Sequence, residues 1–449
     1  MKLKAVIMGA VVTVGSSAYG QGSDAILDLL IKKGVITQRE ANEVREQLDQ
    51  QAAQQVELYN KSKVGNWLDA LVFSGDLRLR AEDFHFEDSL NQADRLRFRY
   101  RLRFGVEARF YDWATVKLRL ASGDGDPVSA NQTFSDTFRK KPINIDVASV
   151  MIAPPGCDAF KLIAGKMDLP IWQPKFNSPM VYDFDVTPEG VAEQLQWMVG
   201  DNFRLFAQAG QYAVKEFSKD ANDTYFFDQQ GGIEAKFGKD SKSPVLKVTA
   251  AGGYYFTDNL SVLKAGDSPN LGNALVDASS TTNNLANFDV LYARGEVVWK
   301  LSDQPFLGTP ALITFNGEYD VNLQDAFDKL AGASSTVVSN DLNQTTGWTA
   351  QIMFGEAKKK GQWQVAYQYK YLEADSTWDA ITDSDYGNGG TDRKGHVIKA
   401  AYNLQDWWQL GCAAFITEKI SDRPNSGHNT VGFAGENQLR LQADTVFKF

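Results

Sequence analysis

The stretch Arg95-Leu96-Arg97-Phe98-Arg99-Tyr100-Arg101-Leu102-Arg103-Phe104 alternates without error between an arginine and an apolar residue. Successive side chains of a β-strand point to opposite faces, so a strand here carries all its charges on one face and all its apolar groups on the other. The stretch from Ala114 to Leu120 repeats this pattern. A strand of this kind needs water on one side and an apolar phase on the other, as the wall of a membrane barrel has.

The period of two continues along the chain from residue 71. It predicts sixteen strands, at 71–84, 95–110, 113–122, 141–153, 158–168, 189–199, 202–213, 225–238, 244–257, 287–300, 310–321, 345–356, 361–373, 393–404, 406–419 and 436–449. Short turns alternate with long polar connections, and aromatic residues gather beside the short turns. Single-chain bacterial outer-membrane barrels share the even strand number and this layout. The predicted fold class is therefore an all-β transmembrane barrel of 16 antiparallel strands, with an N-terminal periplasmic helical segment.

Composition excludes several other classes of protein. The chain has 449 residues and a formal net charge of −10, which argues against a nucleic-acid binder. It contains no internal apolar run of about 18 residues, so a helical membrane protein is also excluded. Its two cysteines and three histidines (His85, His396 and His428) offer no metal scaffold and no recognisable catalytic triad. We therefore expect no catalytic residues, no cofactor and no enzyme activity.

The N-terminus has the three-part layout of a secretory signal peptide. Lys2 and Lys4 precede the apolar run from Ala5 to Val14, and the small-x-small step Ala18-Tyr19-Gly20 follows. Residues 1–20 are the predicted signal peptide. Export places the mature chain in a bacterial envelope or outside the cell.

Residues 21–65 form a predicted periplasmic helical segment ahead of the barrel at 66–449. Thr37-Gln38-Arg39-Glu40 has the form of a capping box, which starts a helix. The apolar positions Ala41, Val44 and Leu48 then follow three-four spacing, but the continuation is polar and weak as a coiled-coil seam. Two interpretations remain open, a helical hairpin and a short coiled coil. Residues 23–60 could accordingly hold subunits together or contact peptidoglycan.

The C-terminal segment ends on an aromatic residue after a further alternating stretch. Leu439, Leu441, Ala443, Thr445, Phe447 and Phe449 share one face. This segment resembles the terminal strand that outer-membrane barrels present to their assembly machinery. Phe447 and Phe449 are the candidate assembly signal.

Several motifs resemble the putative porins of the Gram-negative outer membrane. The motifs are Lys33-Gly34-Val35-Ile36-Thr37, Ser74-Gly75-Asp76-Leu77-Arg78-Leu79-Arg80, Arg99 to Gly105, Ala121 to Ser129, Gly165-Lys166-Met167 and Asp183 to Ala192. The resemblance implies a sixteen-stranded, trimeric channel for passive diffusion of small hydrophilic solutes and ions. The alternative is a structural envelope protein whose barrel is plugged and tethered through its N-terminal helices.

If the apolar face meets lipid, the charged face lines the pore. Strand parity then sends eight basic residues into the lumen: Arg78, Arg80, Arg97, Arg99, Arg101, Arg103, Lys117 and Arg119. By analogy with porins, the connection at 168–188 would fold inward and set Asp183, Asp185 and Glu189 against this basic wall. We expect a weak anion preference from this arrangement. The alternative is that the arginines are structural charges paired across neighbouring strands.

Asp383, Asp385 and Asp392 have a spacing that a calcium ion could use. The segment lacks the terminal bidentate glutamate of a full calcium loop, so a plain loop is favoured and no metal site is expected.

Overall fold

The computed structural model describes residues 31–33, 68–87, 93–219, 222–238, 241, 243–263, 271–273, 287–324, 344–421 and 437–449. The chain divides into two compact units, residues 1–69 and 70–449. The predicted signal peptide and almost all of the predicted helical segment at 21–65 lie outside the described residues. Of the three described residues in that segment, 31–33, Ile31 and Lys32 are helical. In the described part of the chain, no helix is both long and apolar enough to cross a membrane.

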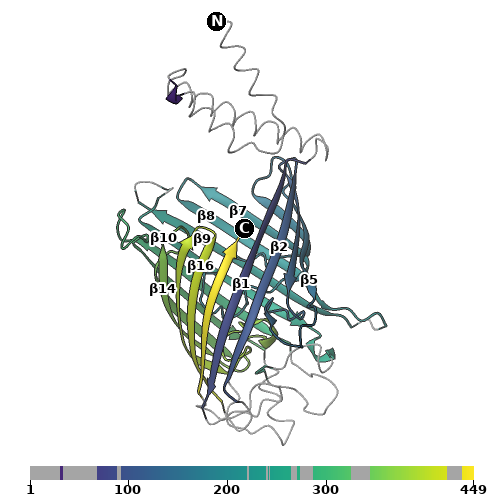
Figure 1. Cartoon of the computed structure of the whole chain (residues 1–449). Coiled ribbons are helices and arrows are strands. Elements are labelled where there is room, and N and C mark those ends of the chain that lie inside the picture. The colour runs from purple at the N-terminus through teal and green to yellow at the C-terminus, as the bar shows by residue number, and fades with distance from the viewer. Residues whose placement is uncertain are drawn as a thin grey trace, which may run out of the picture. The chain divides into compact units, whose positions relative to one another are not determined.

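Residues 70–449 form one antiparallel β-sheet that closes on itself (Figure 1). Its strands are β1 (Ala70–Phe86), β2 (Arg95–Phe110), β3 (Ala114–Ser122), β4 (Gln132–Thr133), β5 (Ile143–Ile152), β6 (Phe160–Lys166), β7 (Glu189–Val199), β8 (Phe203–Lys215), β9 (Thr224–Phe237), β10 (Leu246–Asp258), β11 (Asp289–Lys300), β12 (Leu312–Asn322), β13 (Thr346–Gly355), β14 (Trp363–Leu372), β15 (Arg393–Gln405), β16 (Trp408–Lys419) and β17 (Asn437–Lys448). Two short 3₁₀ turns, Leu260–Val262 and Asp379–Ile381, lie in the connections. Because β1 pairs with both β2 and β17, the sheet has no open edge there and the barrel is closed.

The predicted sixteen-stranded barrel is confirmed. All sixteen predicted strands are present, with ends within two or three residues of the expected positions. The additional strand, β4, has two residues, and it pairs with Arg99 and Tyr100 of β2. It exists because β3 ends at Ser122 while β2 continues to Arg95, which leaves part of the β2 edge free for another partner.

The two faces of the wall differ as the alternation predicts. On β2, the outward-facing Leu96 is 62% exposed and Phe98 is 48% exposed, although both are large and apolar. On the inner face of the barrel, charged side chains such as Arg80, Glu82 and Arg440 are buried against their neighbours. An apolar outer face and a charged inner face fit a wall with hydrocarbon outside and water inside.

The last residue of the chain takes part in closing the barrel. The Phe449 N–H donates a hydrogen bond to the Gly75 carbonyl (3.0 Å), and the Gly75 N–H donates one to the Phe449 carbonyl (2.7 Å). The Phe449 ring lies so close to Gly75 that a Cβ on residue 75 would come within 2.5 Å of it. A glycine at this position therefore lets the terminal ring cover the first strand.

Deleting Phe449 is expected to lower the amount of assembled barrel while export continues, because the terminal strand loses its aromatic end and two closing hydrogen bonds. The measurement is the heat-modifiable band on a gel of outer membranes. The control is Lys448→Gln, which keeps the length and the terminal ring. An undiminished heat-modifiable band after the deletion would contradict this role.

Candidate pore constriction

The predicted basic residues of β1 and β2 lie side by side on the inner face. Arg78 is opposite Arg101 in the antiparallel ladder, and Arg80 is opposite Arg99. Like charges at opposite positions destabilise a sheet unless other groups compensate them. The partners of each arginine therefore determine whether its positive charge is neutralised within the wall.

One group of six charges is internally balanced. Its cations are Arg80, Arg97 and Arg440, and its anions are Glu82, Asp385 and Asp444. Glu82 lies 2.5 Å from Arg97 Nη2 and 2.6 Å from Arg440 Nη2. Arg80 contacts Asp444 through Nε and Asp385 through Nη1, both at 2.7 Å. This group joins β1, β2 and β17 to a connecting loop, and it carries no net charge.

Two further groups are balanced in the same way. Arg101 and Arg103 both contact Asp76, at 2.9 and 2.8 Å, and Asp185 Oδ1 lies 3.5 Å from Arg103 Nη1. On β3, two cations share two carboxylates: Lys117 contacts Asp168, Arg119 contacts Asp146, and Arg119 Nη1 also lies 2.6 Å from Asp168 Oδ1. The members of this last group are Lys117, Arg119, Asp146 and Asp168.

Arg78 and Arg99 differ from their neighbours. Both donate to Asn131, Arg78 to the side-chain oxygen at 2.6 Å and Arg99 to the main-chain carbonyl at 3.3 Å. Neither has a carboxylate within ion-pair distance among the residues that the structure describes. The Nε of each is buried and has no hydrogen-bond partner there. Among the arginines of β1 and β2, these two and Arg95 have no ion-pair partner in the described ranges.

The connection at residues 167–188 runs along the inner face of the opposite wall. The Trp172 N–H donates to Gln208 Oε1 (2.7 Å) on β8 and to Gln230 Oε1 (3.0 Å) on β9. Further along, Ser178 and Gln368 of β14 exchange two hydrogen bonds of 2.9 and 2.7 Å. Inward-facing amide side chains thus satisfy the backbone of a loop that has left its own strands.

A second loop, at residues 374–392, meets the first one. The Asp183 N–H donates to the Ile381 carbonyl (2.8 Å), and Asp183 Oδ2 accepts from the Ser384 N–H (3.3 Å). Burial and the nearby carboxylates of Asp383 and Asp185 raise the pKa of Asp183 well above its usual range. Burial alone would also raise the pKa of Asp385, but the guanidinium groups of Arg80 and Arg440 outweigh it and hold that pKa well below its usual range. The two loops therefore contribute one carboxyl group, Asp183, whose protonated form is favoured, and one, Asp385, whose ionised form is favoured.

Some of the predicted acidic residues lie elsewhere than expected. Asp185 faces Arg101 and Arg103, but the alternation of β7 puts Glu189 on the outer face, where it pairs with Lys166 at 3.2 Å. Glu189 therefore does not face the basic wall. The physical reason is parity, since Glu189 shares its face with the outward-facing Val191.

Two of the three candidate calcium residues, Asp385 and Asp392, make other contacts. Asp385 accepts from Arg80 and Arg440, and Asp392 accepts from Ser421 Oγ at 2.8 Å. Within the described ranges, no group of three or more histidine, cysteine, aspartate and glutamate side chains is placed to hold a metal ion.

Sequence reasoning missed several members of the wall. Asp76, Glu82, Arg440 and Asp444 lie on the same strand faces as the predicted arginines, so the period of two could have found them. Asn131, Asp146 and Asp168 had no such signal, because loop geometry or a β-bulge sets their positions.

A family model described as a putative porin matches residues 89–305 and 304–430. Similar solved structures include OprB of Pseudomonas putida at high pH, with 9% identity over 84% of this chain and 94% of that one and a TM-score of 0.49. The trimer form of OmpT from Vibrio cholerae has 15% identity over 85% and 100%, with a TM-score of 0.44. No curated protein matches the chain.

The raised pKa of Asp183 predicts a pH-dependent stability. A carboxyl group whose pKa is higher in the fold than in the unfolded chain stabilises the fold fully below the unfolded value, about 4. That contribution decreases as the pH rises toward the folded value, by up to about 1.4 kcal/mol per pH unit. Asp183→Asn mimics the protonated form and should flatten this part of the profile.

The measurement is thermal unfolding in detergent by circular dichroism from pH 4 to pH 8. Asp201→Asn, in the exposed turn between β7 and β8, serves as the control. Parallel profiles for wild type and Asp183→Asn would contradict the prediction.

Proposed function

The chain belongs to the putative-porin family, and we propose that it is a passive diffusion channel for small hydrophilic solutes and ions with a weak preference for anions. The family and the closed barrel imply an outer-membrane channel. The anion preference rests on one observation, which is that Arg78 and Arg99 have no carboxylate partner among the described residues. Arg95, at the end of β2, also has no carboxylate partner there, whereas the remaining arginines of β1 and β2 pair with neighbouring acids.

Because Arg78 and Arg99 lie on the inner face of the barrel, their charges should affect which ions pass. A charge beside a narrow water path with a low-dielectric wall acts strongly on a passing ion. Acidic groups on the outside of the protein contribute to its net charge of −10, but salt screens them within about 8 Å. The sign of these local charges, and not the net charge of the protein, should therefore set the selectivity.

The alternative function is a structural envelope protein with a plugged barrel. One observation favours it, because residues 167–188 and 374–392 both pack against the inner face. Single-channel recording in planar bilayers decides between the two. Stable stepwise conductance supports the channel, and silent but fully folded protein supports the plugged barrel.

We also propose that the channel is a homotrimer delivered by the outer-membrane assembly machinery, with its N-terminal helices in the periplasm. The resemblance of the sequence to trimeric porins supports the homotrimer. The signal-peptide layout supports export, and the capping box at Thr37 supports a helix ahead of the barrel. Residues 23–60 would then either join the subunits or bind peptidoglycan.

Replacing Arg78 and Arg99 together by glutamine should shift the reversal potential in a salt gradient toward cation selectivity. One unit charge about 4 Å from an ion in a watery pore is worth about 1 kcal/mol, so the permeability ratio should change roughly fivefold or more. The matched control is Arg119→Gln with Asp146→Asn, which removes a cation together with its partner. Equal shifts in both variants, or none in the first, would contradict the assignment of Arg78 and Arg99.

Removing residues 23–60 separates the two roles of the helices. If they join subunits, the detergent-resistant oligomer should decrease, whereas a peptidoglycan contact should appear as lost co-sedimentation with cell-wall sacculi. If both measurements stay unchanged, the segment has neither role and the subunits associate through their barrels alone.

A further inference from the structure

Residues 374–392, called the crossing segment below, run through the lumen from one wall to the opposite wall. Near the start of this segment, the Trp378 N–H donates to the Tyr255 hydroxyl of β10 at 2.9 Å. Further along, Asp385 contacts Arg80 of β1 at 2.7 Å. Leaving out the two-residue β4, β10 is the ninth of the sixteen strands counted from β1, so these two attachments lie on opposite sides of the barrel. A solute that crosses the barrel has to pass beside this segment.

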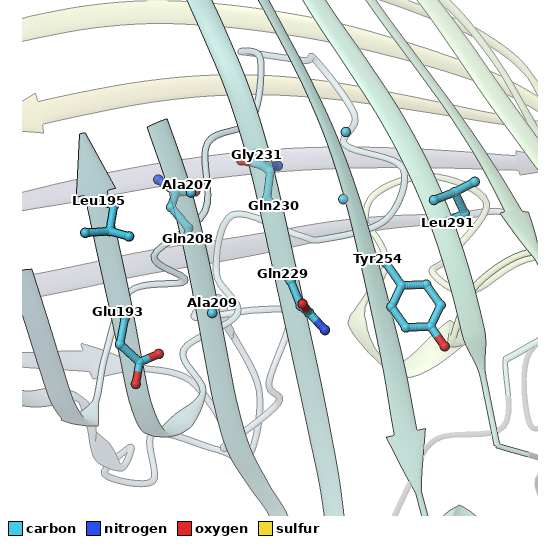
Figure 2. Close-up of a pocket in the computed structure, with 12 residues that line it drawn as sticks. Glu193, Leu195, Ala207, Gln208, Ala209, Gln229, Gln230, Gly231, Tyr254 and Leu291 are labelled. Carbon is cyan, nitrogen blue, oxygen red and sulfur yellow. The ribbon is translucent and has the colours of Figure 1, made fainter. Parts of the chain in front are cut away.

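The two segments inside the barrel are held in different ways. Residues 167–188 are bound by side chains of the strands themselves, such as Gln208 on β8 and Gln230 on β9, which both accept from the Trp172 N–H. Figure 2 shows these two glutamines on neighbouring strands. The crossing segment is also bound by another connection, the one between β10 and β11. A change in that connection therefore leaves the wall contacts of residues 167–188 in place.

The connection between β10 and β11 contacts the crossing segment through Asn273, whose side chain is buried. Its Nδ2 donates to the carbonyls of Ala374 (2.7 Å) and Thr377 (2.8 Å), and its Oδ1 accepts from the Asp379 N–H (2.8 Å). In return, Asp379 Oδ2 accepts from the Leu271 N–H (2.6 Å) and the Asn273 N–H (3.2 Å). One amide and one carboxyl group thus join the two connections through five hydrogen bonds.

Residues 271–273, called the clasp below, also fit closely against the end of the crossing segment. The Thr391 N–H donates to the Leu271 carbonyl at 3.3 Å. A Cβ on Gly390 would lie 2.0 Å from that carbonyl oxygen, and a Cβ on Gly272 would lie 2.4 Å from Thr391 Oγ1. Glycine at these positions lets the two backbones approach this closely. The clasp therefore contacts the crossing segment near its start and near its end.

We infer that the clasp holds the crossing segment in the lumen and that Asn273 is a positioning residue for the width of the pore. Packing of Trp378 in the apolar cluster inside the barrel favours the docked segment. Docking also buries peptide groups, and a buried peptide group without a partner is costly. Asn273 removes this cost for the Thr377 carbonyl and the Asp379 N–H. Without Asn273, lumen water could satisfy both groups only if this part of the segment left the wall.

The inference deepens the proposed channel function and rests on it, because it names a segment that limits the water path. The test is single-channel recording in planar bilayers, with neutral polymers of graded size to measure the pore. Asn273→Ala removes the amide, and Gly390→Ala places a methyl group against the Leu271 carbonyl. Each variant should show a larger unit conductance than wild type and admit larger polymers, while its heat-modifiable band on a gel stays unchanged.

Each of these variants has a matched control. Asn287→Ala removes a different hydrogen bond of the same connection, the one that the Leu260 N–H donates at 2.9 Å. Gly361→Ala changes a glycine with nearly the same backbone as Gly390, since φ is 79° at Gly361 and 83° at Gly390. A Cβ on Gly361 has no atom of the described residues within 4 Å. Both controls should keep the wild-type conductance and polymer cut-off.

Substitutions of Asp379 separate positioning from a general loss of stability. An asparagine keeps an oxygen that can accept from the Leu271 and Asn273 N–H groups, so Asp379→Asn should keep the wild-type conductance. Asp379→Ala leaves both N–H groups without this partner and should reproduce the conductance of Asn273→Ala. If Asp379→Ala lowers the unfolding temperature while the conductance stays at the wild-type value, the role is purely structural and the inference is wrong.

Labelling of a buried position gives a readout that does not depend on conductance. Ala380 lies in the crossing segment and is 5% exposed. In a chain that carries Cys157→Ser and Cys412→Ala, Ala380→Cys should not react with a sulfonated maleimide added outside the cells. Adding Asn273→Ala should make this cysteine reactive, whereas adding Asn287→Ala should not.

The outcomes separate the inference from the proposed function. A silent wild type whose Asn273→Ala variant conducts refutes the channel function of the wild type, and it supports the clasp as the contact that keeps a barrel plugged. A conducting wild type whose conductance and labelling are the same in Asn273→Ala and Gly390→Ala refutes the clasp alone. If no form conducts, the labelling of Ala380→Cys decides on the clasp by itself: reaction only in the presence of Asn273→Ala supports it, and equal labelling overturns it.

Discussion

The closed backbone ladder is the constraint on which the rest of the structure depends. In hydrocarbon, an unpaired N–H or C=O group costs several kcal/mol, so a sheet can cross a membrane only if its first and last strands pair with each other. Here the pairing of β1 with β17 meets that requirement, and it extends from Asp76 opposite Lys448 to Phe86 opposite Gln438. Once the ladder is closed, the register of each strand determines which side chains face the lumen and which face the lipid.

The placement of side chains on the inner face determines both the ion pairs that stabilise the wall and the charges that face the lumen. A strictly alternating strand such as β2 must place its arginines on one face, and the neighbouring strands must then supply acids. Glu82 and Asp76 do so from β1, and Asp444 does so from β17. The two interpretations of the arginines, as structural pairs and as a selectivity wall, are therefore compatible. Most of the arginines are paired, whereas Arg78, Arg95 and Arg99 have no carboxylate partner among the described residues.

The sequence predicts the barrel well because alternation is a local property. Each strand shows its period in about ten residues, and the strand ends agree with the structure to within a few residues. The site is harder to predict, because it depends on contacts between distant segments, such as Ser178 with Gln368 and Arg80 with Asp385. No local pattern shows that the loop at 374–392 contacts the wall or that Asn131 accepts hydrogen bonds from two arginines. Glu189 is a different case, because the alternation along β7 already predicts that its side chain faces outward.

Charged side chains that lack a full set of partners occur on both faces of the barrel wall. Arg78 and Arg99 have no carboxylate partner among the described residues, but on the inner face of a barrel water can solvate them at small cost. Glu193 is also only partly satisfied, but it faces the lipid side, where water is absent and the cost is higher. The free-energy cost of an incompletely paired charge therefore depends on which face of the barrel wall carries it.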